Sequence, residues 1–136
     1  MKFVLRADGG SRGNPGPAAS GAVLYELRHG VEQEVATAVL YLGETTNNVA
    51  EYTAIIIGLN AALAHGVKEL RVELDSELAV KQLNGEYRIK QAHLQDLAMK
   101  VRFHVAQFRT VTFHHIRREY NKRADELVNI TLDSHK

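Results

Sequence analysis

The sequence contains no cysteine, so disulfide bonds and thiolate metal sites are excluded. This agrees with a reducing compartment such as the cytoplasm. The sequence also lacks any apolar run close to the roughly 20 residues that span a bilayer, so no contact with a membrane is expected. At the N-terminus, residues 1–6 reach a charged side chain too early for a signal peptide, and Met1 favours a natural start. We therefore expect a cytoplasmic protein.

A strong net charge is missing as well, because 17 Lys and Arg residues nearly balance 16 Asp and Glu residues. Overall charge therefore does not predict a nucleic-acid-binding protein, and such binding would depend on local clusters or on metal. The clearest basic cluster comprises Arg117, Arg118, Lys122 and Arg123, which is also typical of a solvated loop and helix start. The length and 45% hydrophobic content favour one globular domain over residues 1–136, which we expect to be a monomer.

Hydrophobic periodicity predicts the element order β-β-β-α-β-α-α-β-α. Strands are expected at residues 2–7, 20–27, 31–42, 69–74 and 110–116, and helices at residues 49–63, 76–83, 94–108 and from 121 onward. In the third strand, Val35, Val39 and Leu42 are expected to face inward, and the pair His29 and Gly30 predicts the tight turn before it. Ser76 and Asn121 are expected to be helix N-caps.

This order predicts an α/β fold with a five-stranded mixed sheet flanked by helices. The first three strands have short links and should form an antiparallel meander, whereas strands joined through helices favour parallel pairing. The Gly- and Pro-rich segment at residues 9–17 is too short to separate domains, so we expect a structured loop there.

Four carboxylates occupy positions that favour chemistry. Asp8 and Asp75 follow apolar strands, and functional sites of open α/β sheets form beyond such strand ends. Glu51 and Asp125 fall in the first turns of expected helices, where a negative charge complements the helix dipole. Each acid alone has an ordinary interpretation as a turn residue, a cap or a dipole partner. Together they could form one acidic site, although their spacing does not demonstrate that they meet.

If the acids do meet, their mutual repulsion would raise some pKa values and oppose folding unless a cation binds. A site with only oxygen ligands favours Mg²⁺, with Mn²⁺ as an alternative, over zinc.

The motifs around these acids resemble those of type 1 ribonuclease H. Four segments carry the resemblance in the family's order, and each contains one acid; they lie at residues 8–17 (DGGSRGNPGP), 46–52 (TNNVAEY), 74–80 (LDSELAV) and 118–129 (REYNKRADELVN). The resemblance covers essentially the whole chain and implies a ribonuclease H-like fold. It also implies an endonuclease that hydrolyses the RNA strand of RNA–DNA hybrids and leaves 5′-phosphate and 3′-hydroxyl ends.

The same resemblance implies a mechanism that uses two metal ions. By family analogy, Asp8 would bridge both ions, and Asp125 would help to hold the ion beside the attacking water. Glu51 and Asp75 would hold the ion on the side of the leaving group. The family reads RNA 2′-hydroxyls with its first loop and second motif, and Thr46 with Asn47 matches its pocket for a DNA-strand phosphate. The substrate-binding role is carried to Gly10, Ser11, Gly13, Asn14, Thr46, Asn47 and Asn48. The glycines would equally serve a β-turn, and Thr46 and Asn47 would equally cap a helix.

The sequence departs from the family in two places. Many members carry a histidine on a mobile loop before the last acid, but residues 117–124 contain none. Glu119 is the nearest ionisable substitute and is a candidate auxiliary residue with Arg118, although a solvated loop acid explains it equally well. Some relatives also insert a basic helix and loop that grips the hybrid. Residues 84–92 are short here and carry only Arg88 and Lys90 as basic side chains, so we expect this element to be missing or reduced.

Three other functions fit parts of the pattern. A non-catalytic nucleic-acid-binding module would keep Asn14, Asn47 and Asn48 but would not need all four acids. A related nuclease could act on double-stranded RNA, although the Asp-Gly-Gly-Ser and Thr-Asn-Asn segments favour a hybrid substrate. A phosphate-accepting signalling domain would use Asp8 and Asp75, but three leading strands without helices disfavour its alternating fold.

Overall fold

The computed structural model describes residues 2–136 and confirms the predicted order of elements. They are β1 (Phe3–Ser11), β2 (Gly16–Arg28), β3 (Val31–Thr45), α1 (Asn47–Ala64), β4 (Glu69–Leu74), α2 (Glu77–Leu83), α3 (Ala92–Val105), β5 (Thr110–His115) and α4 (Lys122–Asp133). A single 3₁₀ turn, η1 (Arg118–Tyr120), precedes α4. Within residues 2–136, no helix combines the length and apolarity needed to cross a membrane.

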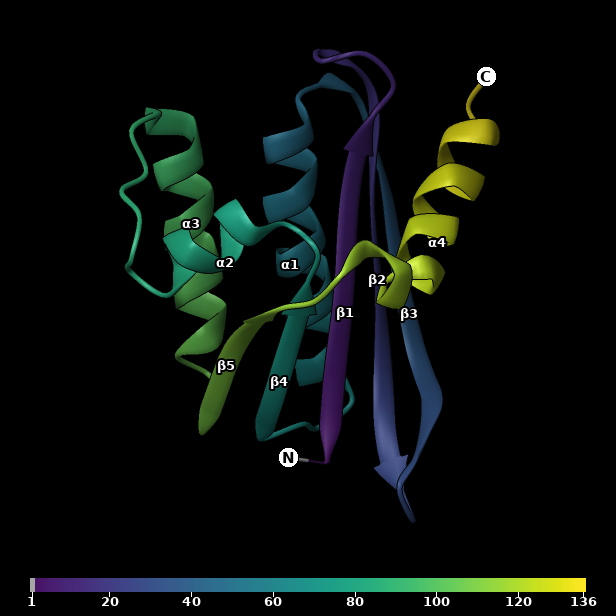
Figure 1. Ribbon diagram of the computed structural model, residues 1–136, viewed down its shortest axis with the longest axis vertical. Coiled ribbons are helices and arrows are strands. Elements are labelled where there is room, and N and C mark those ends of the chain that lie inside the picture. Colours follow the sequence, from purple (N-terminus) through teal and green to yellow (C-terminus); the bar gives the residue numbers. More distant parts are fainter. Residues whose placement is uncertain (1) are drawn as a thin grey trace.

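The five strands form one mixed sheet in the order β3-β2-β1-β4-β5 (Figure 1). The first three strands are antiparallel, as predicted, and β4 is parallel to both β1 and β5. The parallel ladder between β1 and β4 ends at the pair Ala7 and Leu74. Because Asp8 and Asp75 are the next residues along the two strands, they lie side by side at one edge of the sheet.

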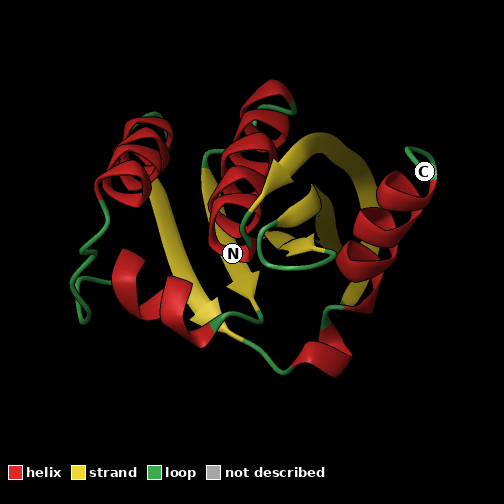
Figure 2. Ribbon diagram, turned by 90° about the horizontal axis from the view of Figure 1, so that it is seen from above, coloured by secondary structure: helices red, strands yellow, loops and turns green. Residues whose placement is uncertain are grey.

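The helices cover the two faces of the sheet unequally (Figure 2). α1, α2 and α3 pack on one face over the main core, which includes Leu24 of β2 and Ile55 of α1. α4 packs alone on the other face, where Leu127 contacts the side of β2 that carries Val23. Neighbouring residues of β2 therefore serve opposite cores, as the alternation of a strand requires.

The β1–β2 segment differs from the predicted loop. β1 continues through Asp8 to Ser11, and β2 begins at Gly16, so the loop shrinks to residues 12–15. The difference arises because β1 has two partners that end at different points. Its parallel ladder with β4 stops at Ala7, whereas its antiparallel ladder with β2 continues to the pair Ser11 and Ala18.

The predicted inward face of β3 is correct only in part. Val35 packs against the main core, but Val39 is 50% exposed. A register shift opposite Leu24 and Tyr25 leaves Val35 without a direct partner, and both Val35 and Ala36 touch the core. Such a bulge exchanges the two faces for the rest of the strand, so a strict period of two fails beyond it. The predicted turn before β3 is confirmed, since His29 and Gly30 both have positive φ angles.

Candidate active site

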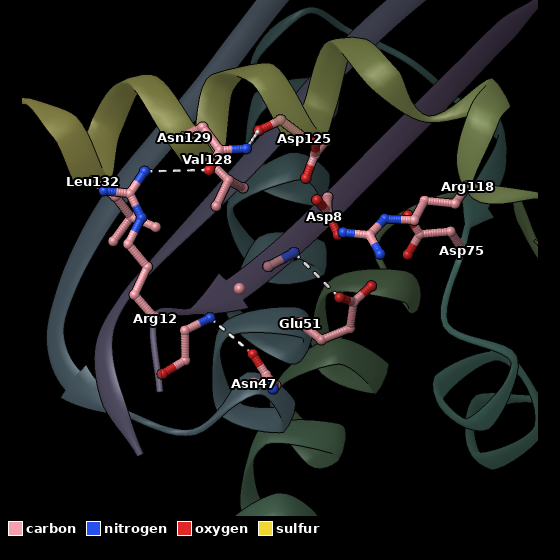
Figure 3. Close-up of a pocket in the computed structure, with 13 residues that line it drawn as sticks. Asp8, Arg12, Asn47, Glu51, Asp75, Arg118, Asp125, Val128, Asn129 and Leu132 are labelled. Carbon is pink, nitrogen blue, oxygen red and sulfur yellow. Dashed lines mark hydrogen bonds between the residues drawn. The ribbon is translucent and has the colours of Figure 1, made fainter. Parts of the chain in front are cut away.

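Three of the four predicted acids meet at the edge of the sheet. Asp8 on β1, Glu51 on α1 and Asp75 after β4 each place one carboxylate oxygen within 4.8 Å of the other two. They line a cavity of about 430 Å³ together with Asp125 of α4. Figure 3 shows the four carboxylates converging from four separate elements. Segments far apart in the sequence therefore form one acidic site.

Asp125 lies on the opposite side of Asp8 from the other acids and is not part of the group of three. Its side chain approaches that of Asp8 closely enough for a hydrogen bond between the two carboxyl groups when one is protonated. α4 brings it there because Leu127 and Val128 on the same helix pack against β2 and its surroundings. Asp125 thus faces the cavity from the second face of the sheet.

A close contact between β1 and α1 fixes Glu51. The backbone N–H of Gly9 donates to Glu51 Oε2 at 3.1 Å. A Cβ atom on Gly9 would lie only 2.2 Å from the carbonyl carbon of Ala50, so only glycine allows the strand and the helix to approach this closely. From β2, Ser20 Oγ donates to Ala50 O at 2.6 Å and secures the same turn of the helix.

The other carboxylate oxygen, Glu51 Oε1, is buried and has no hydrogen-bond partner among the described residues. Burying an unpaired carboxylate oxygen is costly, and a bound cation would remove that cost. The same donor set consists only of carboxylate oxygens, which are the ligands that hard divalent cations prefer. The residues present therefore fit a divalent cation.

Burial and mutual repulsion raise the pKa values of the three clustered acids. The pKa of Asp8 rises to about 8, first because burial disfavours its charge and then because Asp75 and Asp125 lie nearby. Burial, followed by the charges of Asp8 and Asp75, raises the pKa of Glu51 well above its usual range. Burial also raises the pKa of Asp75, although Asn121 and Arg118 oppose the rise. The site therefore carries an excess of negative charge when all four acids are ionised.

Arg118 is a cationic side chain that lies close to these acids (Figure 3). It lines the cavity, and its charge lowers the pKa values of both Asp8 and Asp75. Glu119, the second auxiliary candidate, does not line the cavity; it forms an exposed ion pair with Arg117 at 3.6 Å. The structure thus brings only one of these two residues to the site.

Asn121 has a role that the sequence did not predict. It occupies the N-cap position of α4, but its side chain makes no capping hydrogen bond. Instead the buried amide donates from Nδ2 to Ala7 O at 2.9 Å, and its proximity to Asp75 lowers the pKa of that carboxyl. Asn121 therefore ties the start of α4 to the end of β1. No sequence signal distinguishes this use from ordinary capping, because asparagine is common at helix starts.

The β1–β2 loop is joined to the start of α1 by the predicted substrate-binding residues. Ser11 N donates to Asn47 Oδ1 at 2.8 Å, and Asn47 N donates to Asn14 Oδ1 at 3.1 Å. Gly10, Ser11 and Asn47 line the acidic cavity. Thr46 caps α1 by accepting from Val49 N at 3.3 Å, which confirms the capping interpretation.

The remaining predicted substrate-binding residues, Gly13, Asn14, Thr46 and Asn48, do not line this cavity. Two polar side chains that were not predicted as site residues do line it, Arg12 and Asn129. Arg12 reaches α4, where it pairs with Asp133 at 2.8 Å and donates to Asn129 Oδ1 at 3.3 Å. The loop is therefore held to both α1 and α4.

Comparison with known proteins identifies the family. A family model described as reverse transcriptase-like matches residues 6–131. The ribonuclease H of Pseudomonas putida is 34% identical over 95% of this chain and 92% of its own length. This chain belongs to the type 1 ribonuclease H family. The ribonuclease HI of Halobacterium salinarum is 39% identical, and the alignment covers 93% of this chain and 62% of that protein.

Solved structures agree with this family assignment. LC11-RNase H1, solved in complex with an RNA/DNA hybrid, is 40% identical, has a TM-score of 0.91 and is covered over 99% of its chain. The bifunctional protein Rv2228c of Mycobacterium tuberculosis is 40% identical, but this chain spans only 36% of its length. The N-terminal RNase H domain of Rv2228c superposes with a TM-score of 0.92. The fold predicted from the sequence is therefore confirmed as that of the ribonuclease H family.

Proposed function

We propose that this chain is an endonuclease that hydrolyses the RNA strand of RNA–DNA hybrids with two Mg²⁺ ions. The observation that carries the proposal is the convergence of Asp8, Glu51 and Asp75 within 4.8 Å, with Asp125 beside Asp8. A similar protein, LC11-RNase H1, is known in complex with a hybrid. Conversely, a binding module without catalysis would not need four acids whose repulsion opposes folding.

Asp8, Glu51, Asp75 and Asp125 would hold the metal ions. Bound divalent ions would supply an activated water and would stabilise the negative charge that develops at phosphorus and on the leaving oxygen. Cleavage on the 3′-oxygen side of the phosphate would leave 5′-phosphate and 3′-hydroxyl ends. Arg118 would add positive charge at the rim of the site and keep the neighbouring carboxylates ionised and ready for metal.

The loop and the start of α1 supply donors for the RNA strand. The side-chain oxygens of Asn14 and Asn47 already accept backbone N–H groups, so their Nδ2 atoms remain as donors. Gly10 has no side chain to block the cavity beside them. Donors at this place can bind a 2′-hydroxyl, the group that distinguishes RNA from DNA. Ser11, Gly13, Thr46 and Asn48 complete the predicted contact surface.

Location in the cytoplasm and a monomeric state stay predictions.

Cleavage of an end-labelled RNA–DNA hybrid with and without Mg²⁺ tests the proposal. Asp75→Asn keeps the shape of the side chain but removes one charge from the site, so cutting should fall by several orders of magnitude while the protein stays folded. Asp96→Asn, on the exposed face of α3, is the matched control and should cut normally. Ligation of the products to a 3′-hydroxyl acceptor tests for the 5′-phosphate. Full activity in excess chelator, or in Asp75→Asn, would contradict the proposal.

A further inference from the structure

A second cavity, rich in hydrogen-bond donors, lies beside the acidic one. It measures about 210 Å³ and is lined by Asn48, Gln82, Arg88, Ile89, Lys90, Gln91 and Leu94. The lining combines two cations with three side-chain amides and contains no carboxylate. Asn48 directly follows Asn47, which lines the acidic cavity, so the two cavities flank one turn of α1. The chemistry of this lining fits an anion.

Gln82 supplies a fixed donor to this cavity. The residue is only 9% exposed, and the buried hydroxyl of Tyr52 donates to Gln82 Oε1 at 2.6 Å. Because that bond occupies the oxygen, Nε2 is the atom left to face the cavity. Among residues 2–136, the hydrogen bond from Tyr52 is the one that the Gln82 side chain makes, and Nε2 is not among the buried atoms that lack a partner. Gln82 Nε2 therefore offers an N–H donor that a ligand in the cavity can reach, on a side chain that Tyr52 holds in place.

The two cations are carried by an anchored segment. The backbone N–H groups of Glu86 and Tyr87 donate to Lys81 O at 2.8 and 3.2 Å. Ile89, which lies between Arg88 and Lys90, packs against the main core, and its carbonyl accepts from Gln95 Nε2 at 2.7 Å. The backbone on both sides of the cations is therefore held in place. Their charges stay at the rim of the cavity.

We propose that this cavity binds a backbone phosphate of the nucleic-acid substrate while the acidic site holds the scissile bond. Gln82 Nε2 would donate to a phosphate oxygen, and Arg88 and Lys90 would neutralise its charge. A polymer fits better than a free ion because the cavity shares one helical turn with the acidic site. This inference rests on the proposed function, since it assigns the cavity to the same substrate.

The variant Gln82→Glu removes the Nε2 donor but keeps the side-chain oxygen that accepts the hydrogen bond from Tyr52. Tyr52 can donate to a carboxylate oxygen as well as to an amide oxygen, so the fold should be kept. The variant replaces the free N–H group with a second oxygen, which repels phosphate. We expect the Kd for a labelled hybrid, measured by fluorescence anisotropy in chelator, to rise at least roughly tenfold. Gln107→Glu, at the far end of α3, adds the same charge and should leave Kd unchanged.

The double variant Arg88→Ala with Lys90→Ala tests the cations. Lys68→Ala with Arg109→Ala is the matched control, because it removes the same two residue types at the opposite end of the parallel strands. Only the first pair should lower the slope of log Kd against log salt, by about one for each phosphate that is no longer neutralised. In cleavage assays KM should rise while kcat is kept, whereas a merely structural defect would lower kcat and the melting temperature.

A test with inorganic phosphate distinguishes the two anions that this cavity could bind, a backbone phosphate of the substrate and a free phosphate ion. Inorganic phosphate could raise the melting temperature of the wild type but not that of Gln82→Glu, while both proteins bind the hybrid with the same Kd. In that case the cavity binds a free ion and the proposal is wrong. Hybrid binding that is equal in all variants would also overturn it. If the wild type cuts hybrids but these variants behave normally, only this inference fails. If the wild type binds without cutting and the variants lose binding, the proposed function fails and the phosphate site stands.

Discussion

Gly9 and Glu51 are joined by a hydrogen bond of 3.1 Å from the strand backbone to Oε2, while Glu51 Oε1 is buried without a partner among the described residues. One oxygen of the carboxylate is thus used to position the side chain, and the other is left for a ligand. The contact requires a residue without a side chain at position 9, because a Cβ atom there would meet the backbone of Ala50. A single glycine therefore links the packing of α1 to the geometry of the acidic site.

Gly9→Ala should destabilise the protein and disorder the site. The added methyl group would lie 2.2 Å from a backbone carbon, so β1 and α1 must move apart. We expect a loss of roughly 3 kcal/mol in the free energy of unfolding, as for severe overpacking. Urea denaturation measures it. Gly10→Ala is the matched control, because its nearest atom, in Val128, lies at 3.6 Å and allows an ordinary contact. Equal stabilities of the two variants would refute this account.

Without metal, the free energy of unfolding should fall as the pH rises from about 4 to about 8. The pKa of Asp8 is 3.8 in its ordinary state and about 8 in the fold, so between these values the folded protein binds more protons than the unfolded chain. Stability is then greatest at low pH and is lost as the pH approaches the folded pKa. Thermal unfolding in chelator at several pH values measures the trend.

Mg²⁺ should flatten this pH dependence, because the bound cation favours the ionised acids. Asp8→Asn removes the titrating group, so in chelator near pH 8 it should melt at a higher temperature than the wild type. A melting temperature below that of the wild type under these conditions would show that the acids do not repel one another strongly. Asp96→Asn again serves as the control and should not change the pH trend.

The four acids could be singled out from the sequence because each lies in a segment that resembles a motif of the family, although no local pattern showed that they meet. Asp8 and Asp75 follow strands whose alternation is plain, and the ladder that ends at Ala7 and Leu74 brings them together. The use of Asn121 could not be predicted in the same way. Whether its amide caps α4 or reaches Ala7 depends on the distance between the helix and the sheet, which no local pattern records.

The error at Val39 has a similar origin. Alternation predicts which residues of a strand share a face only while the register is regular, and the bulge at Val35 interrupts it. The sequence of β3 contains no glycine or proline near that point to reveal the bulge. The wrong face therefore follows from an irregularity in the pairing of β2 with β3, which alternation within β3 does not record.

Asn121→Ala should cost roughly 1–3 kcal/mol of stability, because it leaves the buried carbonyl of Ala7 without its donor. It also removes the neighbouring amide that lowers the pKa of Asp75, so a higher pH should be needed for metal-dependent cutting. Asn84→Ala removes a similar bond, from Nδ2 to Phe113 O, but at an exposed position, so its cost should be smaller. If both variants unfolded at the same urea concentration, the buried link would have no special role.

Arg118→Ala should shift the pH dependence of cleavage upward. Arg118 lowers the pKa values of Asp8 and Asp75, so without it these acids lose their protons only at higher pH and bind metal less readily at neutral pH. Arg118→Lys keeps a positive charge and should restore most of the profile. Arg117→Ala removes an exposed neighbour that pairs with Glu119 and should leave the profile unchanged. The measurement is kcat/KM against pH at fixed Mg²⁺. A uniform loss of rate at every pH in Arg118→Ala, with no shift of the profile, would instead indicate direct contact with the substrate.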